Sequence, residues 1–391
     1  MTIIVDEMKI QEDLVWDKHS GELIGYVDLG DKEINEAVLK DCELIASHIL
    51  VFLVRGAVNP LKYSFANFAT KDISSLQIFP IFWKAVGILE DCDLKVLAVT
   101  SDGASSNRSF YKMHSKMSGS IVTEDGSVVY KTANFFAEDE RFIHFICDQP
   151  HALKTGRNNL SHSAFGQSSR LLWNDGDYIL WGHISQLVNE DLECGLKVCP
   201  KVSMEHINLT PFSRMNVRLA AQVLSESMSV ALLHFGPPDA KGTAEYCLMF
   251  DKFFDCMSVR NSVEHKHKRK PFLAPYTSVD DERFLWLLEK CLPYFAKWKK
   301  FIEERPGKFS PADKLRMFIS WQTHEALNVT TSSIIDIIKY LLNHNVEYEN
   351  LCQEPLENYF GRQRSMGHRS DNPSDCLATM TTLFVEQITF S

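Results

Sequence analysis

Three acidic side chains, far apart in the sequence, are of the right kind to hold a metal ion at the edge of a sheet. Asp102 follows an apolar run in residues 95–107, and the small residues after it leave room around its carboxylate. Asp6 follows the apolar residues 3–5, and Glu357 lies in the segment QEPLENYF at residues 353–360. A carboxylate at the carboxyl end of a buried strand is held by the sheet yet open to a ligand that arrives over the strand ends. The pattern therefore predicts a metal site made only of carboxylates.

The chemistry that suits such a site is the cleavage of phosphodiester bonds. Mg²⁺ and Mn²⁺ prefer oxygen ligands, and two such ions about 3.5–4 Å apart stabilise both the attacking and the leaving oxygen. Arg362, Arg364 and Arg369 follow Glu357 on the same segment, and we expect them to contact DNA phosphates. Simpler alternatives stay open, in which Asp102 only caps the next helix and Glu357 is an ordinary acid on a helix surface.

The elements that position Asp6 and Asp102 are predicted to form a mixed sheet. Strands are expected at residues 3–5, 47–54 and 96–99, with a hairpin over 14–29 and a further strand pair within 118–146. Helices are expected over 34–45 and over 72–90, where apolar residues recur at helical spacing. This order is that of an RNase H-like sheet, in which the strand at 96–99 lies beside the first strand.

Residues 151–345 are predicted to be mostly helical. Apolar stripes run through 217–231 and 285–292, the second with a kink at Pro293, and helices are expected to start near Ser310 and Ser333. The basic run HKHKRK at 265–270 is expected to be a loop. Because Glu357 follows this block, the helices would be an insertion. We predict an α/β protein, an RNase H-like mixed sheet interrupted by a large, mostly α-helical insertion domain, with parts at 1–150, 151–345 and 346–391.

The composition limits the class of protein. The 391 residues carry a formal net charge of -10, which argues against a general nucleic-acid binder because phosphate contacts need Lys and Arg. A local metal site offsets part of this objection. The ten cysteines are scattered without a CxxC pair, which disfavours a zinc finger and fits reduced thiols in the cytosol or nucleus. No signal peptide or membrane-spanning stretch is expected.

Taken in order, several motifs resemble those of the P element transposases and their vertebrate relatives that carry a THAP zinc domain. Each motif is weak alone, but their order along nearly the whole chain is specific. The motifs are DEM at 6–8, GYVDLG at 25–30, SDGASSN at 101–107, CDQPHALKT at 147–155, LWN at 172–174, WGHI at 181–184, HIN at 206–208 and QEPLENYFG at 353–361.

The resemblance implies DNA cleavage and strand transfer by metal-bound carboxylates, on an RNase H-like fold that is split by a GTP-binding insertion. By position, Asp102 corresponds to the second acid and Glu357 to the third. The first acid is either Asp6 or Asp28, and both stay open. The implied cofactors are Mg²⁺ or Mn²⁺, and GTP.

For guanine nucleotide, the resemblance suggests Asp255 as the residue that accepts hydrogen bonds from the base, with a lysine such as Lys201 as its partner. The sequence holds no GxxxxGK[ST] phosphate loop. The expected partners are DNA, at transposon ends and target, and a second copy of the chain, with no membrane.

The chain departs from the family pattern in three ways, since no THAP domain or leucine zipper is found, Glu354 replaces the usual aspartate, and the chain ends soon after the third acid. These departures keep open an alternative, an inactive or host-adopted relic that binds DNA or protein. We expect a nuclear protein, or a cytoplasmic one if the chain is truncated.

Overall fold

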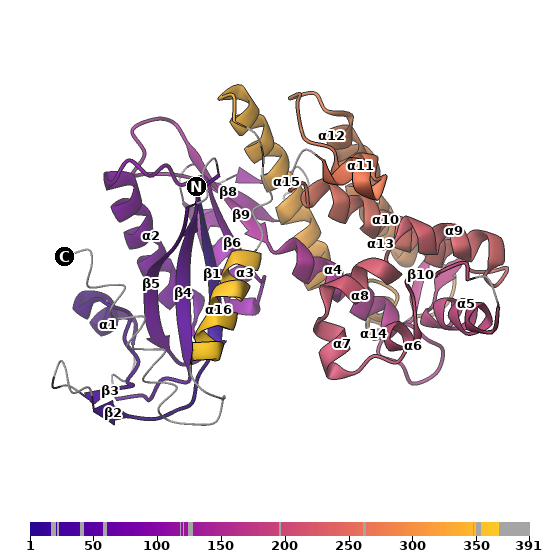
Figure 1. Ribbon diagram of the computed structural model, residues 1–391, viewed down its shortest axis with the longest axis horizontal. Helices are drawn as coiled ribbons and strands as arrows, with labels where there is room; N and C mark the ends of the chain where they lie inside the picture. Colours follow the sequence, from indigo (N-terminus) through magenta and orange to yellow (C-terminus); the bar gives the residue numbers. More distant parts are fainter. Residues whose placement is uncertain are drawn as a thin grey trace. The chain divides into compact units, whose positions relative to one another are not determined.

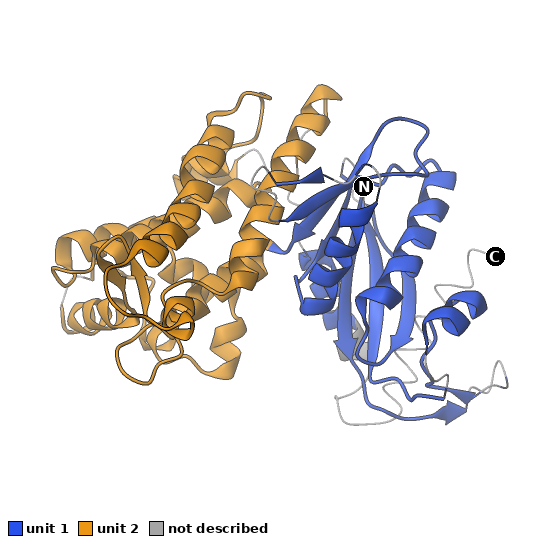
Figure 2. Ribbon diagram, turned by 180° about the vertical axis from the view of Figure 1, so that it is seen from behind, with its two compact units in different colours: residues 1–148, 351–391 blue, residues 149–350 orange. Residues whose placement is uncertain are grey.

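The structure, a computed structural model, describes residues 1–16, 21, 23–39, 43–57, 61–117, 119, 121–123, 128–194, 197–260, 263–346, 348 and 353–366, with backbone only for 363–366. Figure 1 shows its helices and strands in chain order. The chain divides into two compact units. Unit 1 comprises Met1–Asp148 and Leu351–Ser391, and unit 2 comprises Gln149–Asn350 (Figure 2). Unit 2 is therefore inserted into the sequence of unit 1.

Unit 1 is built on a seven-stranded mixed sheet. Its strand order is β5 (Lys62–Thr70), β4 (His48–Arg55), β1 (Thr2–Lys9), β6 (Ala98–Ser101), β9 (Phe142–Cys147), β8 (Val129–Ala133) and β7 (Ile121–Val122). The β1–β6 and β6–β9 pairs are parallel and the other pairs are antiparallel. The predicted neighbourhood of the first strand and the strand before Asp102 is thus confirmed. The predicted hairpin is a separate pair, β2 (Val15–Trp16) and β3 (Leu23–Ile24), and its turn lies outside the described residues.

The strand β5 was not predicted from the sequence. Its residues, KYSFANFAT, are mostly half-buried and include small polar side chains, so they lack the apolar run or strict alternation by which strands are recognised. Its neighbour β4 has six consecutive buried residues, Ile49 to Val54, as expected for a strand covered on both faces.

The described residues of unit 1 form five helical segments. They are α1 (Lys32–Val38), α2 (Ser75–Asp91), α3 (Ser105–Met113), the 3-10 turn η1 (His114–Lys116) and α16 (Glu354–Met366). The first is shorter than the predicted helix over 34–45, because it ends at Leu39, whose backbone is extended. On α16, Leu356 and Phe360 pack in one buried cluster with Ile4 and Met8 of β1. This contact attaches α16 to the face of the sheet toward which alternate residues of β1 point.

Unit 2 is mostly helical, with one small hairpin, β10 (Leu172–Asn174) and β11 (Asp177–Ile179). Its helices are α4 (Gln149–Ser161), α5 (Trp181–Glu193), α6 (Met204–Ile207), α7 (Pro211–Met215), α8 (Val217–Val223), α9 (Glu226–Phe235), α10 (Lys241–Met257), α11 (Glu264–Lys268), η2 (Pro271–Leu273), α12 (Glu282–Trp286), α13 (Leu292–Glu304), α14 (Pro311–Arg316) and α15 (Trp321–Asn343). Its core includes the fully buried Trp298, Tyr246 and Phe250. In the described residues, no helix combines the length and the apolar character needed to cross a bilayer.

Several predicted details of unit 2 need correction. The helix start near Ser310 is confirmed, since its hydroxyl caps α14, but Ser333 lies inside α15 and starts nothing. The irregularity expected at Pro293 is a π-helical turn, Leu287–Cys291, just before α13. The basic run at 265–270 is not a loop throughout, because most of it forms α11, which ends at the left-handed Arg269.

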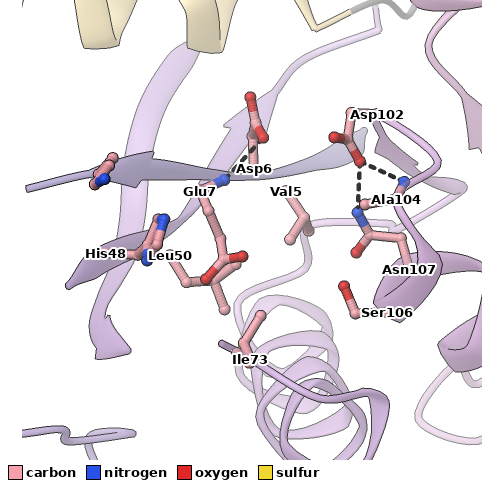
Figure 3. Close-up of a pocket in the computed structure, with 11 residues that line it drawn as sticks. Val5, Asp6, Glu7, His48, Leu50, Ile73, Asp102, Ala104, Ser106 and Asn107 are labelled. Carbon is pink, nitrogen blue, oxygen red and sulfur yellow. Dashed lines mark hydrogen bonds between the residues drawn. The ribbon is translucent and has the colours of Figure 1, made fainter. Parts of the chain in front are cut away.

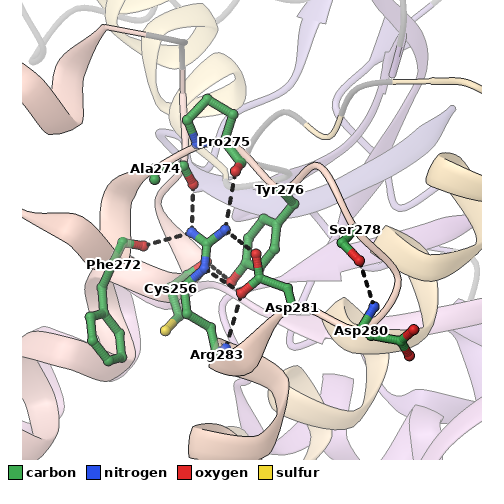
Figure 4. A network of polar contacts seen from close by, with 9 residues as sticks. All are labelled: Cys256, Phe272, Ala274, Pro275, Tyr276, Ser278, Asp280, Asp281 and Arg283. Atoms are coloured by element: carbon green, nitrogen blue, oxygen red, sulfur yellow. Dashed lines mark hydrogen bonds and ion pairs between the residues drawn. The ribbon is translucent and has the colours of Figure 1, made fainter.

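A buried arginine fastens the segment after α11 onto α10 (Figure 4). Arg283 donates hydrogen bonds to the carbonyl groups of Phe272, Ala274 and Pro275 and to the carboxylate of Asp281. Its guanidinium lies 3.6 Å from the centre of the Tyr276 ring. The Tyr276 hydroxyl in turn donates to the Cys256 carbonyl of α10 at 3.0 Å. All donors that hold the segment therefore find acceptors, which fixes its path in a buried setting.

Candidate active site

Three carboxylates lie at the same level on three adjacent parallel strands. In the register of the sheet, Val5 of β1 pairs with Ser101 of β6, which pairs with Cys147 of β9. Asp6, Asp102 and Asp148 are the next residues; Asp102 and Asp148 directly follow β6 and β9, whereas Asp6 lies within β1, which continues to Lys9. Since neighbouring strands lie about 4.8 Å apart and residues in register point to the same face, these acids form a row across the sheet at the carboxyl ends of β6 and β9. Figure 3 shows the carboxyl groups of Asp6 and Asp102 on one side of the sheet and the side chains of Val5 and Glu7 on the other.

The turn after β6 holds Asp102 in place. Its Oδ1 accepts hydrogen bonds from the Ala104 amide at 2.7 Å and from Asn107 Nδ2 at 2.9 Å. Gly103 has φ +74°, a conformation that favours glycine, and a Cβ there would lie 3.4 Å from Cys147 Sγ. Asp102 does not cap α3, because the N-cap of that helix is Ala104 and no side chain caps it. Both bonds to Asp102 use the same oxygen, so they leave Oδ2 for a second task.

The helix α16 brings Glu357 to the same face as Asp6. Its anchors Leu356 and Phe360 contact Ile4 and Met8, the residues two before and two after Asp6 on β1. Glu357 itself is exposed. Residue 357 therefore lies near β1, the strand that carries Asp6, although it follows Asp102 by more than two hundred residues in the sequence.

The acids influence one another electrostatically. Burial raises the pKa of Asp6 from 3.8 to about 7, and the negative charges of Asp102, Asp148 and Glu357 raise this pKa further, against a hydrogen bond from the Glu7 amide that lowers it. The charged groups that shift this pKa are all acids. An arrangement that concentrates negative charge in this way destabilises the folded protein unless a cation is bound.

The structure separates Asp28 from these acids. Its backbone pairs with Ala69 at the outer side of β5, and its side chain accepts hydrogen bonds from the Gly30 amide and from Asn35, each at 2.8 Å. Four strand spacings separate this position from β6 in the sheet order, which amounts to roughly 19 Å. Of the two candidates for the first acid, the structure brings Asp6 and not Asp28 beside Asp102.

Two acids near this edge were not selected from the sequence. Asp148 follows an apolar strand in the same way as Asp102, and this signal could have marked it. Glu7 points to the opposite face of the sheet, where the Thr70 hydroxyl donates to its carboxylate at 2.9 Å and burial raises its pKa. A cavity of about 240 Å³ opens at this edge, with Asp6, Glu7, Asp102 and Asn107 among its lining residues.

The arginines predicted to contact DNA are only partly described. Arg362 is exposed on α16. The backbone of Arg364 belongs to the same helix, but its side chain is not described, and Arg369 lies outside the described residues.

The two residues expected at a guanine nucleotide differ in their surroundings. Asp255 is buried on α10, where Lys270 donates to it at 2.9 Å and to Asp251 at 2.7 Å. Burial and the charge of Asp251 raise the pKa of Asp255 to about 7, while Lys270 opposes this shift. Lys201 is exposed in the segment before α6. Lys270 thus forms an ion pair with Asp255, and a joint role of Asp255 and Lys201 at a nucleotide stays a prediction.

Known proteins resemble both parts of this architecture. Residues 1–115 match the family described as "TNP-like, RNase H N-terminal domain", and residues 150–270 match "TNP-like, GTP-binding insertion domain". Together the two matches take in more than half of the chain. The chain belongs to the P element-like transposase family. Its fold is that of the family, an RNase H-like domain that carries an insertion domain of the GTP-binding type.

Two relatives of this transposase-like chain show the extent of the likeness. The human DNA transposase THAP9 is 25% identical over 274 residues, which are 66% of this chain and 28% of the human protein. The chain thus spans little more than a quarter of that relative. A solved structure, the Drosophila P element transposase strand transfer complex, has a TM-score of 0.70 at 18% identity and covers 98% of this chain and 75% of its own.

Proposed function

We propose that this chain is the catalytic core of a DNA transposase, which cleaves DNA and joins strands with the help of a divalent metal held by Asp6, Asp102 and Glu357. The observation that carries the proposal is the register of β1 against β6, which aligns Asp6 with Asp102 on the face where α16 is anchored. Family membership agrees with this chemistry, since the RNase H-like part is the one that holds the acids.

The residues fit a hard divalent cation. All the proposed ligands are carboxylates, the donors that Mg²⁺ and Mn²⁺ prefer. The pKa of Asp6 is raised by burial first and then by the charges of the neighbouring acids, and a bound cation would offset this repulsion. In the described part of the chain, no three His, Cys, Asp or Glu side chains already lie close enough to enclose a metal ion. Binding would therefore draw the carboxylates together, and the exposed Glu357 has the most freedom to move.

The protein's own residues would divide the work. Asp102 is fixed by the turn that Ala104 and Asn107 build, so it gives the site a rigid arm. Glu357 on α16 gives an adjustable arm, and Arg362, five residues further on the same helix, would contact a DNA phosphate. When bound, the metal would stabilise the charge that develops on the scissile phosphate and lower the pKa of the attacking hydroxyl group.

GTP is the second proposed cofactor. The support is the matched insertion domain at 150–270, with Asp255 as the residue that would accept hydrogen bonds from guanine. Since Lys270 holds Asp255, nucleotide would have to displace this lysine or use it as a phosphate contact. Calorimetric titration of GTP and of ATP into the wild type and Asp255→Asn tests this. GTP-selective heat that disappears in the variant supports the role, and equal heat with both proteins contradicts it.

A DNA-binding relative without nuclease activity is the second candidate function. It is favoured by a departure from the family pattern beside the third acid, where Glu354 replaces the usual aspartate. DNA as the partner, and the nucleus as the place of action, are parts of both proposals.

Nicking of a short DNA duplex in Mg²⁺ or Mn²⁺ separates the two functions. The transposase proposal predicts nicking by the wild type, a loss of about a hundredfold or more in Asp6→Asn, Asp102→Asn and Glu357→Gln, and full activity in Asp28→Asn, the matched control that also removes one carboxylate from unit 1. Nicking that persists in Asp102→Asn would mark a contaminant. A wild type that binds DNA without nicking it would support the second candidate.

A further inference from the structure

A pair of buried hydrogen bonds joins the start of α16 to the sheet. Gln353 immediately precedes the helix, and its backbone amide donates to Asp148 Oδ1 at 2.9 Å. Its side-chain Nε2 donates to the carbonyl oxygen of Val5 at 3.0 Å. Both partners are almost fully buried, with Gln353 3% and Asp148 2% exposed. Buried bonds of this kind are costly to break, because a donor or acceptor is then left without a partner.

These bonds tie α16 to the two strands that flank the strand of Asp102. Val5 belongs to β1 and precedes Asp6, and Asp148 directly follows β9. The strand β6 lies between β1 and β9. Gln353 therefore spans the row of acids, and its position is set from both sides of Asp102.

The anchored residue lies one helical turn from the third acid. The Gln353 carbonyl accepts the amide of Glu357 at 3.1 Å, the first regular bond of the helix around that residue. With a rise of about 1.5 Å per residue, the two Cα atoms are only about 6 Å apart along the helix axis. A displacement of Gln353 therefore moves Glu357 by almost the same distance.

We propose that Asp148 and Gln353 are positioning residues, which set where α16 presents Glu357 to Asp6 and Asp102. This inference rests on the proposed transposase function. Asp148 acts in it as a hydrogen-bond acceptor for the start of the helix, and its negative charge is favourable there because the amide end of a helix carries a partial positive charge. It is the third acid of the row, but it is not a metal ligand.

The test compares two changes at one residue in the full chain. Asp148→Asn removes the charge but keeps an oxygen that can accept the Gln353 amide, whereas Asp148→Ala removes the acceptor. We expect amide exchange in residues 354–362 to rise about tenfold or more in Asp148→Ala and in Gln353→Ala, and to stay within about threefold of the wild type in Asp148→Asn. Asn358→Ala, an exposed change on the same helix, is the matched control and should not alter exchange.

Mn²⁺ binding and nicking complete the test. Asp148→Asn should keep both within about threefold, while Asp148→Ala should lower nicking by about tenfold or more. Unchanged amide exchange in α16 of both Asp148→Ala and Gln353→Ala would overturn the inference. An Asp148→Asn variant that loses as much Mn²⁺ affinity as Asp148→Ala would also overturn it, because Asp148 would then be a metal ligand. If the wild type neither nicks DNA nor binds Mn²⁺, the proposed function fails, but the exchange result still decides whether Gln353 and Asp148 hold the helix. If Asp148→Ala does not fold, Gln353→Ala carries the same comparison.

Discussion

Replacing Asp6 by asparagine should stabilise the protein while it destroys the proposed metal site. The pKa of Asp6 is raised from 3.8 to about 7 by burial and by the charges of the neighbouring acids. In the folded protein the carboxyl therefore keeps its proton up to about pH 7, whereas the unfolded chain loses it near 3.8. The raised pKa of Asp6 therefore favours the folded protein at low pH. This contribution to the free energy of unfolding is lost as the pH rises through about 7.

The magnitude follows from the shift. A difference of about 3 pH units corresponds to about 4 kcal/mol, the cost of carrying the ionised Asp6 at pH 8. Of this amount, about 1.3 kcal/mol should be lost between pH 6 and pH 8. Asparagine resembles the protonated acid, so Asp6→Asn should be more stable than the wild type at pH 8 by up to about 4 kcal/mol, and it should lack the pH-dependent loss.

The stability of unit 1 can be measured separately from that of unit 2 by urea unfolding. Pulsed hydrogen exchange, followed in peptides of β1, reports when unit 1 unfolds. Mn²⁺ added at ten times its dissociation constant should stabilise the wild type by about 1.4 kcal/mol and leave Asp6→Asn unchanged. Asp28→Asn is the control, because the Asp28 side chain accepts local bonds from Gly30 and Asn35, and it should keep the pH profile and the Mn²⁺ response. The reasoning is refuted if Asp6→Asn destabilises unit 1 at pH 8, or if Asp28→Asn gives the same gain.

Three further predictions concern other buried groups. Burial lowers the pKa of His114 to about 4, so the free energy of unfolding should fall as the pH drops below 6.5, by about 2 kcal/mol between pH 7.5 and 5. His114→Gln should remove this fall in urea unfolding at a series of pH values, and an equal dependence on pH in both proteins would contradict the prediction. Lys270→Met leaves Asp251 and Asp255 without their cation and should lower the free energy of unfolding by about 3–5 kcal/mol. The loss should be larger at pH 8 than at pH 6, because the pKa of Asp255 is about 7, and a small loss in urea unfolding that does not depend on pH would contradict this. Leu356→Ala leaves a cavity under α16 and should lower the free energy of unfolding by about 2–5 kcal/mol. It should also reduce nicking although every acid is intact, and undiminished nicking would show that the contact of α16 with the sheet is dispensable.

Two acids directly follow buried strands, and of these Asp102 was selected from the sequence but Asp148 was not. Asp102 could be found because an apolar run, an acid and small residues follow one another directly. The choice between Asp6 and Asp28 could not be made, since both lie at suitable distances along the chain from Asp102. What separates them is the pairing of β1 with β6, a contact between residues almost a hundred positions apart, and spacing along a chain does not determine such a register.

Other features depend on neighbours that local patterns do not show. The basic run at 265–270 was treated as uniform, yet Lys270 turns inward to two acids of α10 while Lys268 stays exposed. The apolar stripe expected at 285–292 is right only in part, because Cys291 is buried but Leu285 and Leu288 are exposed, and Phe284 and Leu287 are buried in their place. The π-helical turn at 287–291 adds a residue to one turn and shifts which side chains face the core.

A Mn²⁺ titration followed by electron paramagnetic resonance tests, without relying on activity, whether Asp6, Asp102 and Glu357 share one divalent cation. The wild type and Asp28→Asn should bind Mn²⁺ alike, and Glu357→Gln should bind it about tenfold or more weakly. Equal affinity in Glu357→Gln and the wild type would show that α16 contributes nothing to the site and would rule out the shared cation.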